Sequence, residues 1–384
     1  MTSLPQPAAQ ALAHSQQLAT LIRSEIEAAG GWIDFARYMH LALYAPGLGY
    51  YTGGAKKFGA EGDFVTAPEI SPLFARTLAR QVVQVLRLTC GDMLELGAGT
   101  GCLAATLLVE LQKLGQLPQR YLILEVSAQL REVQRKSLEQ ALPPDLMQRV
   151  QWLYRLPETF TGLVLGNEVL DALPVHIVGA NNNGLYERGV GWDGQGFTWQ
   201  ERPITSGHVF DLADKLKLPS GYVTEICPAA IGLVASFASI LQRGALMFID
   251  YGFPRREYYH AQRSSGTLMC HYRQHAHGDP FLYPGLQDIT AHVDFTAVTE
   301  AGVAHGLQLQ GYCGQAQFLI NCGITDLLTQ VSPSDVAAYL PLVAQAQKLL
   351  SPAEMGELFK VIALSKDFPQ GMLGFTSGDR GHTL

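Results

Sequence analysis

The sequence lacks the long apolar runs and the charge excess that mark several protein classes. None of its apolar stretches reaches 18 residues, so we expect no membrane span. Charged residues make up 16% of the chain and the net charge is −7, which gives no electrostatic reason to bind nucleic acid. The first 23 residues contain neither a charged start followed by an apolar stretch nor an early arginine. We therefore expect a cytoplasmic protein that neither inserts into membranes nor binds nucleic acid.

The cysteines are few and scattered. Six are present and no two form a C-x-x-C pair, a pattern that suits a reducing compartment better than a disulfide framework or a zinc ribbon. Cys270, His271, His275 and His277 lie close enough in sequence to suggest zinc, but no second cluster has ligand spacing. A solvated polar loop explains this segment better, and we expect no metal site.

What the sequence does contain is an alternation of short apolar runs with helical patterns, beginning near residue 93. The expected strands are 93–97, 121–125, 150–156 and 162–168, and the expected helices between them are 102–114 and 127–141. Such alternation is typical of a parallel sheet covered by helices on both faces. The predicted fold class is therefore α/β, with a doubly wound sheet.

Other segments flank or interrupt this core. Helices are expected over 16–44 and 73–88, so residues 1–90 are predicted to form a helical N-terminal region with a Gly-rich covering loop. Residues 91–384 then form the core, with insertions at about 174–220 and 253–295. The first insertion has the turn sequences of an antiparallel meander at 174–203, and the second contains a long loop over 264–295. The alternation is expected to resume with a strand at 221–226, a helix from Pro228 to about Gln242 and a strand at 245–252. Strands near 307–312 and 359–365, separated by helices, complete the chain.

The strongest single motif is the glycine-rich turn from Glu95 to Gly101, which ends one strand and opens a helix. Glycines in such a turn let a ligand approach the backbone and the helix N-terminus. A dinucleotide fingerprint would need glycine where Cys102 stands, and Walker-A spacing is absent. The Glu95 carboxylate suits a cationic ligand such as S-adenosylmethionine. Glu125 ends the next strand and could accept both ribose hydroxyls, although it would serve NAD equally well. A turn that binds nothing remains the alternative.

With these motifs the sequence resembles the class I S-adenosylmethionine-dependent methyltransferases, and more closely the MidA-like family, which includes the mitochondrial complex I assembly methyltransferase. The similar stretches are GYYTGGAKKFGAEGDFVTAPEISPLF (49–74), LELGAGTGCLAATLL (94–108), LILEVSAQLREVQ (122–134), GNEVLDALPV (166–175), EICPAA (225–230), IDYG (249–252), GTLMCHY (266–272) and DITAHVDF (288–295). The resemblance covers about residues 45–300 and is weaker beyond them. It implies a Rossmann-like core that binds S-adenosylmethionine and, for mitochondrial members, arginine methylation of a core complex I subunit.

The candidate residues follow from the motifs and the resemblance together. The cofactor-binding candidates are Thr66, Pro68, Glu95, Gly97, Ala98, Gly99, Gly101, Glu125, Ser127 and Asn167. The catalytic candidates are Glu168, Asp171 and His292.

Glu168 and Asp171 follow an apolar strand at the sheet edge where ligands bind in open α/β folds. A carboxylate can hold an arginine guanidinium by two hydrogen bonds and draw positive charge from the attacking nitrogen. Other arginine methyltransferases place Ser-Glu where Asn167-Glu168 stands here. The alternative is that these acids occupy the N-cap and first turn of a helix.

Three further groups are weaker candidates. Asp63, Thr66 and Glu69 could close a loop over the cofactor or cap the helix after Pro72. Tyr50 and Tyr51 could line an acceptor channel or act as packing anchors. His292 and Asp294 resemble, by position, the histidine-containing substrate loop of arginine methyltransferases.

Three functions compete at this stage. The first is a protein arginine methyltransferase that uses S-adenosylmethionine and acts on a respiratory complex I subunit or a similar protein. The second is a methyltransferase for a small molecule or another nitrogen acceptor, and the third is a non-catalytic S-adenosylmethionine-binding assembly factor. The intact motif, with Glu95, its glycines and Glu125, argues against the third. The sequence leaves the oligomeric state open, a homodimer included.

Overall fold

The structure is a computed structural model that describes residues 4–53, 66–369 and 371–384. The chain divides into two compact units, which we describe separately. Unit 1 comprises Met1–Phe64, Asp171–Gly232 and Arg255–His292, and unit 2 comprises Val65–Leu170, Leu233–Pro254 and Val293–Leu384. These boundaries differ from the domain boundaries expected from the sequence, which stay a prediction. Among the described residues, no helix is both long and apolar enough to cross a membrane.

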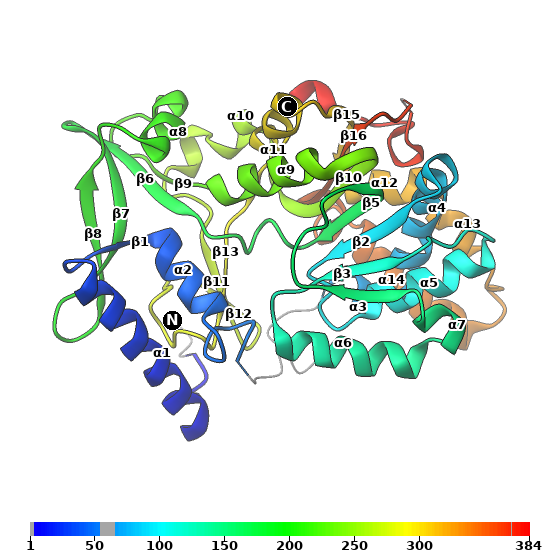
Figure 1. Cartoon of the computed structure of the whole chain (residues 1–384), viewed down its shortest axis with the longest axis horizontal. Helices are drawn as coiled ribbons and strands as arrows, with labels where there is room; N and C mark the ends of the chain where they lie inside the picture. The colour runs from blue at the N-terminus through cyan, green and yellow to red at the C-terminus, as the bar shows by residue number, and fades with distance from the viewer. Residues whose placement is uncertain (1–3, 54–65, 370) are drawn as a thin grey trace. The chain divides into compact units, whose positions relative to one another are not determined.

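Unit 2 contains the mixed sheet of an α/β fold, so the predicted fold class is confirmed. Its strands lie in the order β15-β16-β10-β5-β2-β3-β4, with β14 paired to β10 (Figure 1). The strands are β2 (Asp92–Leu96), β3 (Tyr121–Leu124), β4 (Val150–Leu153), β5 (Phe160–Asn167), β10 (Leu241–Phe253), β14 (Val293–Asp294), β15 (Gln308–Gly314) and β16 (Phe359–Lys366). The strands β2, β3, β4 and β5 are parallel, as the alternation predicted. The strand near 359–365 makes the sheet mixed, because β16 runs antiparallel to both β10 and β15.

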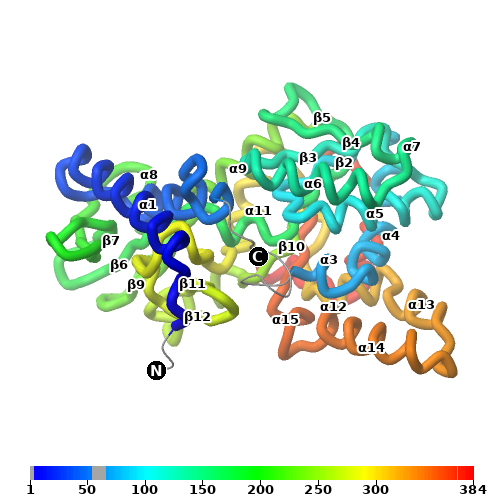
Figure 2. The backbone as a smooth tube through the Cα atoms, turned by 90° about the horizontal axis from the view of Figure 1, so that it is seen from below, coloured from blue at the N-terminus to red at the C-terminus, as the bar shows by residue number. Residues whose placement is uncertain are grey.

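Helices cover this sheet because alternate strand residues are apolar on each face. One face carries Leu163, Leu165 and Met247, which pack with α4, α5 and the helices near the C-terminus. On the opposite face Leu364 packs against Gly302 of α11. The helices of the unit are α3 (Ala67–Ile70), α4 (Pro72–Thr89), α5 (Cys102–Lys113), α6 (Ala128–Ala141), α7 (Pro144–Met147), α11 (Phe295–Ala304), α12 (Gln315–Asn321), α13 (Ile324–Leu328), α14 (Val336–Leu350) and α15 (Met355–Leu358). Figure 2 shows α12 to α15 gathered beside α3 and α4.

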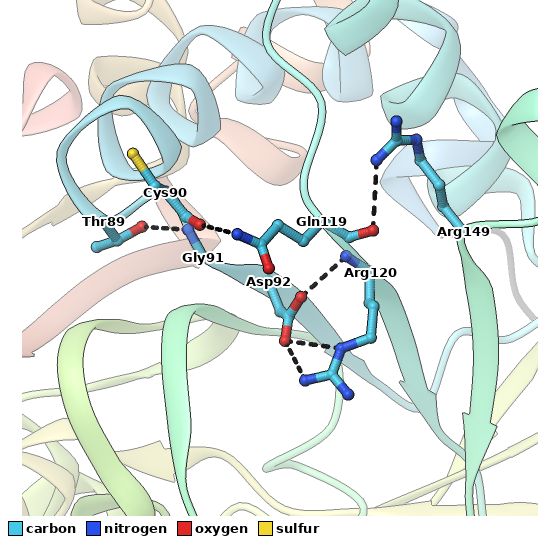
Figure 3. A network of polar contacts seen from close by, with 7 residues as sticks. All are labelled: Thr89, Cys90, Gly91, Asp92, Gln119, Arg120 and Arg149. Carbon is cyan, nitrogen blue, oxygen red and sulfur yellow. Dashed lines mark hydrogen bonds and ion pairs between the residues drawn. The ribbon is translucent and has the colours of Figure 1, made fainter.

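The amino-terminal edge of the sheet is held by a polar network (Figure 3). The Asp92 carboxylate accepts the Arg120 backbone N–H at 2.9 Å and its guanidinium at 3.0 and 2.5 Å. The Gln119 side chain donates to the Cys90 carbonyl, and the Arg149 guanidinium donates to the Gln119 carbonyl. The network therefore ties β2 to β3 at the ends opposite those where the candidate residues lie.

Unit 1 contains a five-stranded antiparallel sheet and a three-stranded one. The first has the order β1-β7-β6-β9, with β8 paired to β7, and the second has the order β12-β11-β13. The strands are β1 (Ile33–Asp34), β6 (His176–Asn181), β7 (Gly184–Trp192), β8 (Phe197–Pro203), β9 (Val223–Ile226), β11 (Met269–Tyr272), β12 (His275–His277) and β13 (Asp288–Thr290). The helices are α1 (Ala9–Ala28), α2 (Phe35–Tyr44), α8 (His208–Leu216) and α10 (Arg255–Tyr258), while α9 (Pro228–Ile240) leads directly into β10. The predicted meander over 174–203 is confirmed by β6, β7 and β8.

Two expectations for this part of the chain were wrong. The strand at 221–226 does not resume the core alternation, because β9 pairs antiparallel with β6 of the meander. The segment 264–295 is not a continuous loop, because it contains β11, β12, β13 and β14. Partner choice depends on distant residues, and the polar sequence of β12 has no apolar alternation to mark it as a strand.

The single helix expected over 16–44 is two helices. α1 ends at Ala28 and α2 begins at Phe35, with β1 between them. Gly30 and Gly31 have φ of 77° and 92°, a conformation that ends a right-handed helix. Asp34 then caps α2 by accepting the Arg37 N–H at 2.7 Å.

Candidate active site

The glycine-rich turn follows β2 and opens α5. Gly97, Gly99 and Gly101 have φ of 57°, 54° and 84°, values that residues other than glycine rarely adopt. Gly101 is the N-cap of α5, and no side chain caps this helix. The turn therefore presents backbone and a helix N-terminus to a ligand, without a Cβ in the way.

Glu95 lies at the end of β2 and is almost fully buried. The Tyr121 hydroxyl donates to its Oε2 at 2.6 Å. Burial raises the pKa of Glu95 to about 7, against the opposing effect of the Tyr121 hydrogen bond, and the neighbouring Glu125 raises it further. This carboxyl group can therefore change charge near neutral pH, and a cationic ligand would favour its ionised form.

Glu125 follows β3, and two nearby residues donate hydrogen bonds to its carboxylate. Its Oε1 accepts the Ser127 N–H at 2.9 Å, and its Oε2 accepts from Gln134 Nε2 at 3.0 Å. Burial raises the Glu125 pKa, while these two hydrogen bonds lower it. Ser127 also caps α6 through its hydroxyl, which accepts the Leu130 N–H at 3.2 Å. A carboxylate oxygen can accept more than one hydrogen bond, so Glu125 keeps capacity for a vicinal diol.

The short helix α3 lies against the glycine turn. Thr100 Oγ1 donates to Glu69 Oε1 at 3.2 Å, and Cys102 Sγ contacts the Pro68 carbonyl at 3.4 Å. Thr66 is the N-cap of α3 without a side-chain hydrogen bond, and Ser71 caps α4, so the idea that Thr66 or Glu69 caps the helix after Pro72 was wrong. Asp63 lies outside the described residues.

Asn167 ends β5, the strand beside β2, and Glu168 follows it. Asn167 Nδ2 donates to Glu168 Oε1 at 3.2 Å, while the buried Asn167 Oδ1 has no hydrogen-bond partner among the described residues. Glu168 has φ of 54°, an uncommon conformation for a residue with a side chain. Such strain persists where the surroundings impose it, and it clusters at functional sites.

Asp250, in the carboxyl-terminal part of β10, holds the backbone that follows Glu168. Its Oδ2 accepts the Val169 N–H at 3.1 Å and the Leu170 N–H at 2.8 Å. The Glu168 N–H itself donates to the Ile249 carbonyl at 2.9 Å. These bonds over-determine the turn and keep Glu168 in its left-handed conformation.

Asp171 and His292 belong to unit 1. The Ala291 N–H donates to the Asp171 carbonyl at 3.0 Å, so Asp171 lies beside the residue that precedes His292. The alternative that Asp171 caps a helix was wrong, because residues 168–175 form turns and no helix begins there. Asp171 instead lies near Tyr51, whose pKa is raised by burial and by Asp288 and Asp171 among other neighbours.

The tyrosines of the N-terminal loop lie within the same unit. The Tyr51 hydroxyl donates to Asp288 Oδ1 at 3.0 Å, and its ring stacks on that of Tyr44 at 5.5 Å. Tyr50 is fully buried against Tyr51, with ring centroids 5.1 Å apart, as a packing anchor would be. A role for either tyrosine in an acceptor channel stays a prediction.

Asp294 and the segment from Cys270 to His277 are the candidates that remain. Asp294 caps α11 by accepting the Ala297 N–H at 3.1 Å. Cys270 is buried in β11, and His275 and His277 lie in β12. Within the described part of the chain, no group of three or more His, Cys, Asp or Glu side chains could hold a metal ion.

Three residues of this region were missed in the sequence. Asp250 carries a signal like that of Glu125, an acid directly after the apolar run 245–249, and could have been found. Gln134 lies between Leu130 and Leu138 on the buried stripe of α6, and a buried amide there requires hydrogen-bond partners. Tyr121 begins a strand and carried no signal.

The structure thus brings together most of the predicted cofactor residues. The register pairs Leu96 with Leu124 and with Gly166, so β2, β3 and β5 end side by side. The groups available to a ligand at these ends are an open helix N-terminus, a glycine turn, two buried carboxylates and a buried amide oxygen. It fits a ligand that carries a cationic group and a ribose but no phosphate.

Comparison with solved structures supports this assignment. A structure from Burkholderia thailandensis bound to S-adenosyl-homocysteine is 53% identical over 100% of both chains, with a TM-score of 0.96. A second structure from that organism, in its native form, is 52% identical over 100% of both chains, with a TM-score of 0.94.

Named relatives are more distant. The mitochondrial protein arginine methyltransferase NDUFAF7 of Danio rerio is 28% identical over 369 residues, which cover 88% of this chain and 84% of the relative. The NDUFAF7 homolog of Drosophila melanogaster is 28% identical over 413 residues, which cover 94% and 87%. The model of the S-adenosyl-L-methionine-dependent methyltransferase family matches residues 77–313. Since that match spans more than half of the sequence, the chain belongs to this family of S-adenosylmethionine-dependent methyltransferases.

Proposed function

We propose that the protein is an arginine N-methyltransferase whose acceptor is a protein, a subunit of respiratory NADH dehydrogenase or one similar to it. Two observations support the proposal. The relatives that cover most of the chain are named protein arginine methyltransferases. Glu168, which follows β5 in a left-handed conformation, carries the argument, because this strain presents a carboxylate where an acceptor would bind.

The acceptor chemistry explains why a carboxylate is needed. A guanidinium is cationic at any accessible pH and is a poor nucleophile. Glu168 can accept hydrogen bonds from it and draw its positive charge away from the attacking nitrogen. Methyl transfer forms an N–C bond, breaks an S–C bond and releases one proton from the nitrogen. Catalytic roles for Asp171 and His292 stay predictions.

The residues of unit 2 would hold the cofactor, which supplies a methyl group on a sulfonium. Glu95 would balance its ammonium charge, the turn from Gly97 to Gly101 would accommodate its chain, and Glu125 would accept the ribose hydroxyls. Thr66, Pro68, Ala98, Ser127 and Asn167 would complete this site, because α3 and the end of β5 flank the turn. The protein then contributes position, desolvation and charge.

The test compares methylated arginine peptides by mass spectrometry in cells with and without the protein. We expect at least one arginine peptide to lose its methyl groups when the protein is absent and to regain them on re-expression. Re-expressed Glu168→Gln should fail to restore them while binding S-adenosyl-homocysteine as the wild type does. Glu139→Gln, which changes an exposed carboxylate of α6, should restore methylation and is the matched control.

Two results would contradict the proposal. If no arginine peptide changes, the acceptor is of another class, even when the protein binds S-adenosyl-homocysteine. If Glu168→Gln loses cofactor affinity and activity together, Glu168 is a cofactor or structural residue. The cellular compartment remains a prediction, since the relatives are named mitochondrial and we expect a cytoplasmic protein.

A further inference from the structure

Gln134 is a fully buried side chain in the middle of α6 that contacts two of the ligand-binding segments. Its Nε2 donates to the Gly99 carbonyl at 3.1 Å and to Glu125 Oε2 at 3.0 Å. Its Oε1 accepts the Trp152 indole N–H at 2.9 Å. One amide thus joins the glycine turn after β2, the acid after β3 and the strand β4.

Trp152 determines which way this amide faces. The indole nitrogen can only donate, so the Gln134 oxygen must point towards it. Both amide hydrogens are then directed at Gly99 and Glu125, and the flip ambiguity common to glutamine side chains is removed. All groups of the amide are satisfied, as a buried polar side chain requires.

The backbone of α6 also lies close to the glycine turn. A Cβ added at Gly101 would lie 3.4 Å from Leu138 Cγ and 3.5 Å from Gln134 Cα. The backbone of α6 therefore packs closely against the turn at Gly101.

The two donors to Glu125 fix the orientation of its carboxylate. The Ser127 N–H occupies one oxygen and Gln134 occupies the other, so the remaining lone pairs have defined directions. Because the buried carboxyl group favours its neutral form, the Gln134 donor also keeps the Glu125 pKa lower than burial alone would. A vicinal diol needs the ionised form, which accepts from two hydroxyls.

We propose that Gln134 is a positioning residue for the cofactor, acting through Glu125 and Gly99, and that Trp152 orients it. This inference rests on the proposed role of Glu125 in binding the cofactor ribose. It makes Gln134 necessary for affinity although it lies behind the residues that would touch the ligand.

The test measures the affinity of the full-length protein for S-adenosyl-homocysteine by calorimetry. Gln134→Met keeps the length of the side chain and removes all three hydrogen bonds, and we expect its affinity to fall at least about tenfold, about 1.4 kcal/mol. Trp152→Phe removes only the orienting donor and should give a smaller loss. The matched control is Gln140→Met, the same substitution at an exposed position of α6, which should bind as the wild type does.

Gln134→Glu separates positioning from a purely structural role. At low pH its protonated carboxyl can still donate one hydrogen bond to Glu125, whereas at high pH two carboxylates repel each other. The affinity of this variant relative to wild type at the same pH should therefore fall as the pH rises from about 5.5 to about 8. The ratio removes any titration that both proteins share.

Each outcome bears on the inference. A tenfold or greater loss in Gln134→Met together with a falling affinity ratio in Gln134→Glu supports it, and the falling ratio alone does so if the first variant does not fold. Affinities equal to that of wild type in both variants, or a constant ratio across the pH range, would overturn it. Failure of the wild type to bind S-adenosyl-homocysteine would instead overturn the proposed function, and the inference with it.

Discussion

Replacing Glu95 by glutamine should stabilise the free protein at high pH. The Glu95 carboxyl group has a pKa of about 7, raised mainly by burial from an ordinary value of 4.5. The folded state therefore favours the neutral carboxyl group more than the unfolded chain does. The stability this provides is fully present below about pH 4.5 and is lost as the pH rises through about 7. At about 1.36 kcal/mol for each pKa unit, the folded state above that range is destabilised by roughly 3 kcal/mol.

Glu95→Gln removes the charge and keeps the shape, and its amide oxygen can still accept from Tyr121. We expect the variant and wild type to have similar melting temperatures near pH 5. Near pH 8 the variant should melt higher by about 5–10 °C, the shift that roughly 3 kcal/mol gives in a domain of this size.

Calorimetric melting of both proteins without ligand, at a series of pH values, provides the measurement. The difference between them isolates Glu95, because all other groups titrate in both. Glu139→Gln should show no such trend, since the carboxylate it replaces is exposed. Glu139→Gln should also bind S-adenosyl-homocysteine as the wild type does, whereas Glu95→Gln should bind it more weakly. A Glu95→Gln protein that melts below wild type near pH 8, or that differs from it equally at every pH, would refute the reasoning.

Two further substitutions test the scaffold at opposite edges of the sheet. Asp250→Ala removes the acceptor of the Val169 and Leu170 N–H groups, so amide hydrogen exchange at these residues should accelerate by about tenfold or more. Methyl transfer should fall while affinity for S-adenosyl-homocysteine is kept, and unchanged exchange would contradict this role. Asp92→Asn leaves an acceptor for the Arg120 N–H but removes the ion pair, and we expect a loss of about 1 kcal/mol in the free energy of unfolding. Because Asp92 lies at the amino-terminal edge, calorimetry should show unchanged cofactor affinity, and a large loss would show that this network reaches the ligand.

The strands and helices of the core were predictable because their signals are local. The runs that became β2, β3 and β5 are apolar, and each is followed by glycine or an acid where a buried strand must stop. That pattern alone is enough to predict that Glu95, Glu125 and Glu168 lie at strand ends. The structure brings these ends side by side, since neighbouring parallel strands end at the same edge.

What was not predictable depends on partners far away in the sequence. β9 has the sequence of a core strand, yet Glu225 pairs with Ile177 of the meander. The same Glu225 accepts the Thr267 and Leu268 N–H groups, so its burial reflects a loop some forty residues later. Nothing in the local pattern of β9 distinguishes this partner from a core strand. For Glu168, the sequence indicated a carboxylate at a strand end but not its positive φ, which Asp250 and Ile249 impose.

Three places where local preference and structure disagree lie together at one edge of the core sheet. There an acid is buried at Glu95, a side chain adopts φ of 54° at Glu168 and an amide interrupts an apolar helix stripe at Gln134. Each feature is unfavourable for folding on its own, and each persists because neighbouring hydrogen bonds enforce it. At the opposite edge Asp92 simply pairs with Arg120. Single exceptions occur elsewhere, such as Cys90 with φ of 50°, whereas these three lie together at the carboxyl ends of β2, β3 and β5. We expect the cofactor to bind at these ends, because ligands of open α/β sheets bind at the carboxyl ends of the strands.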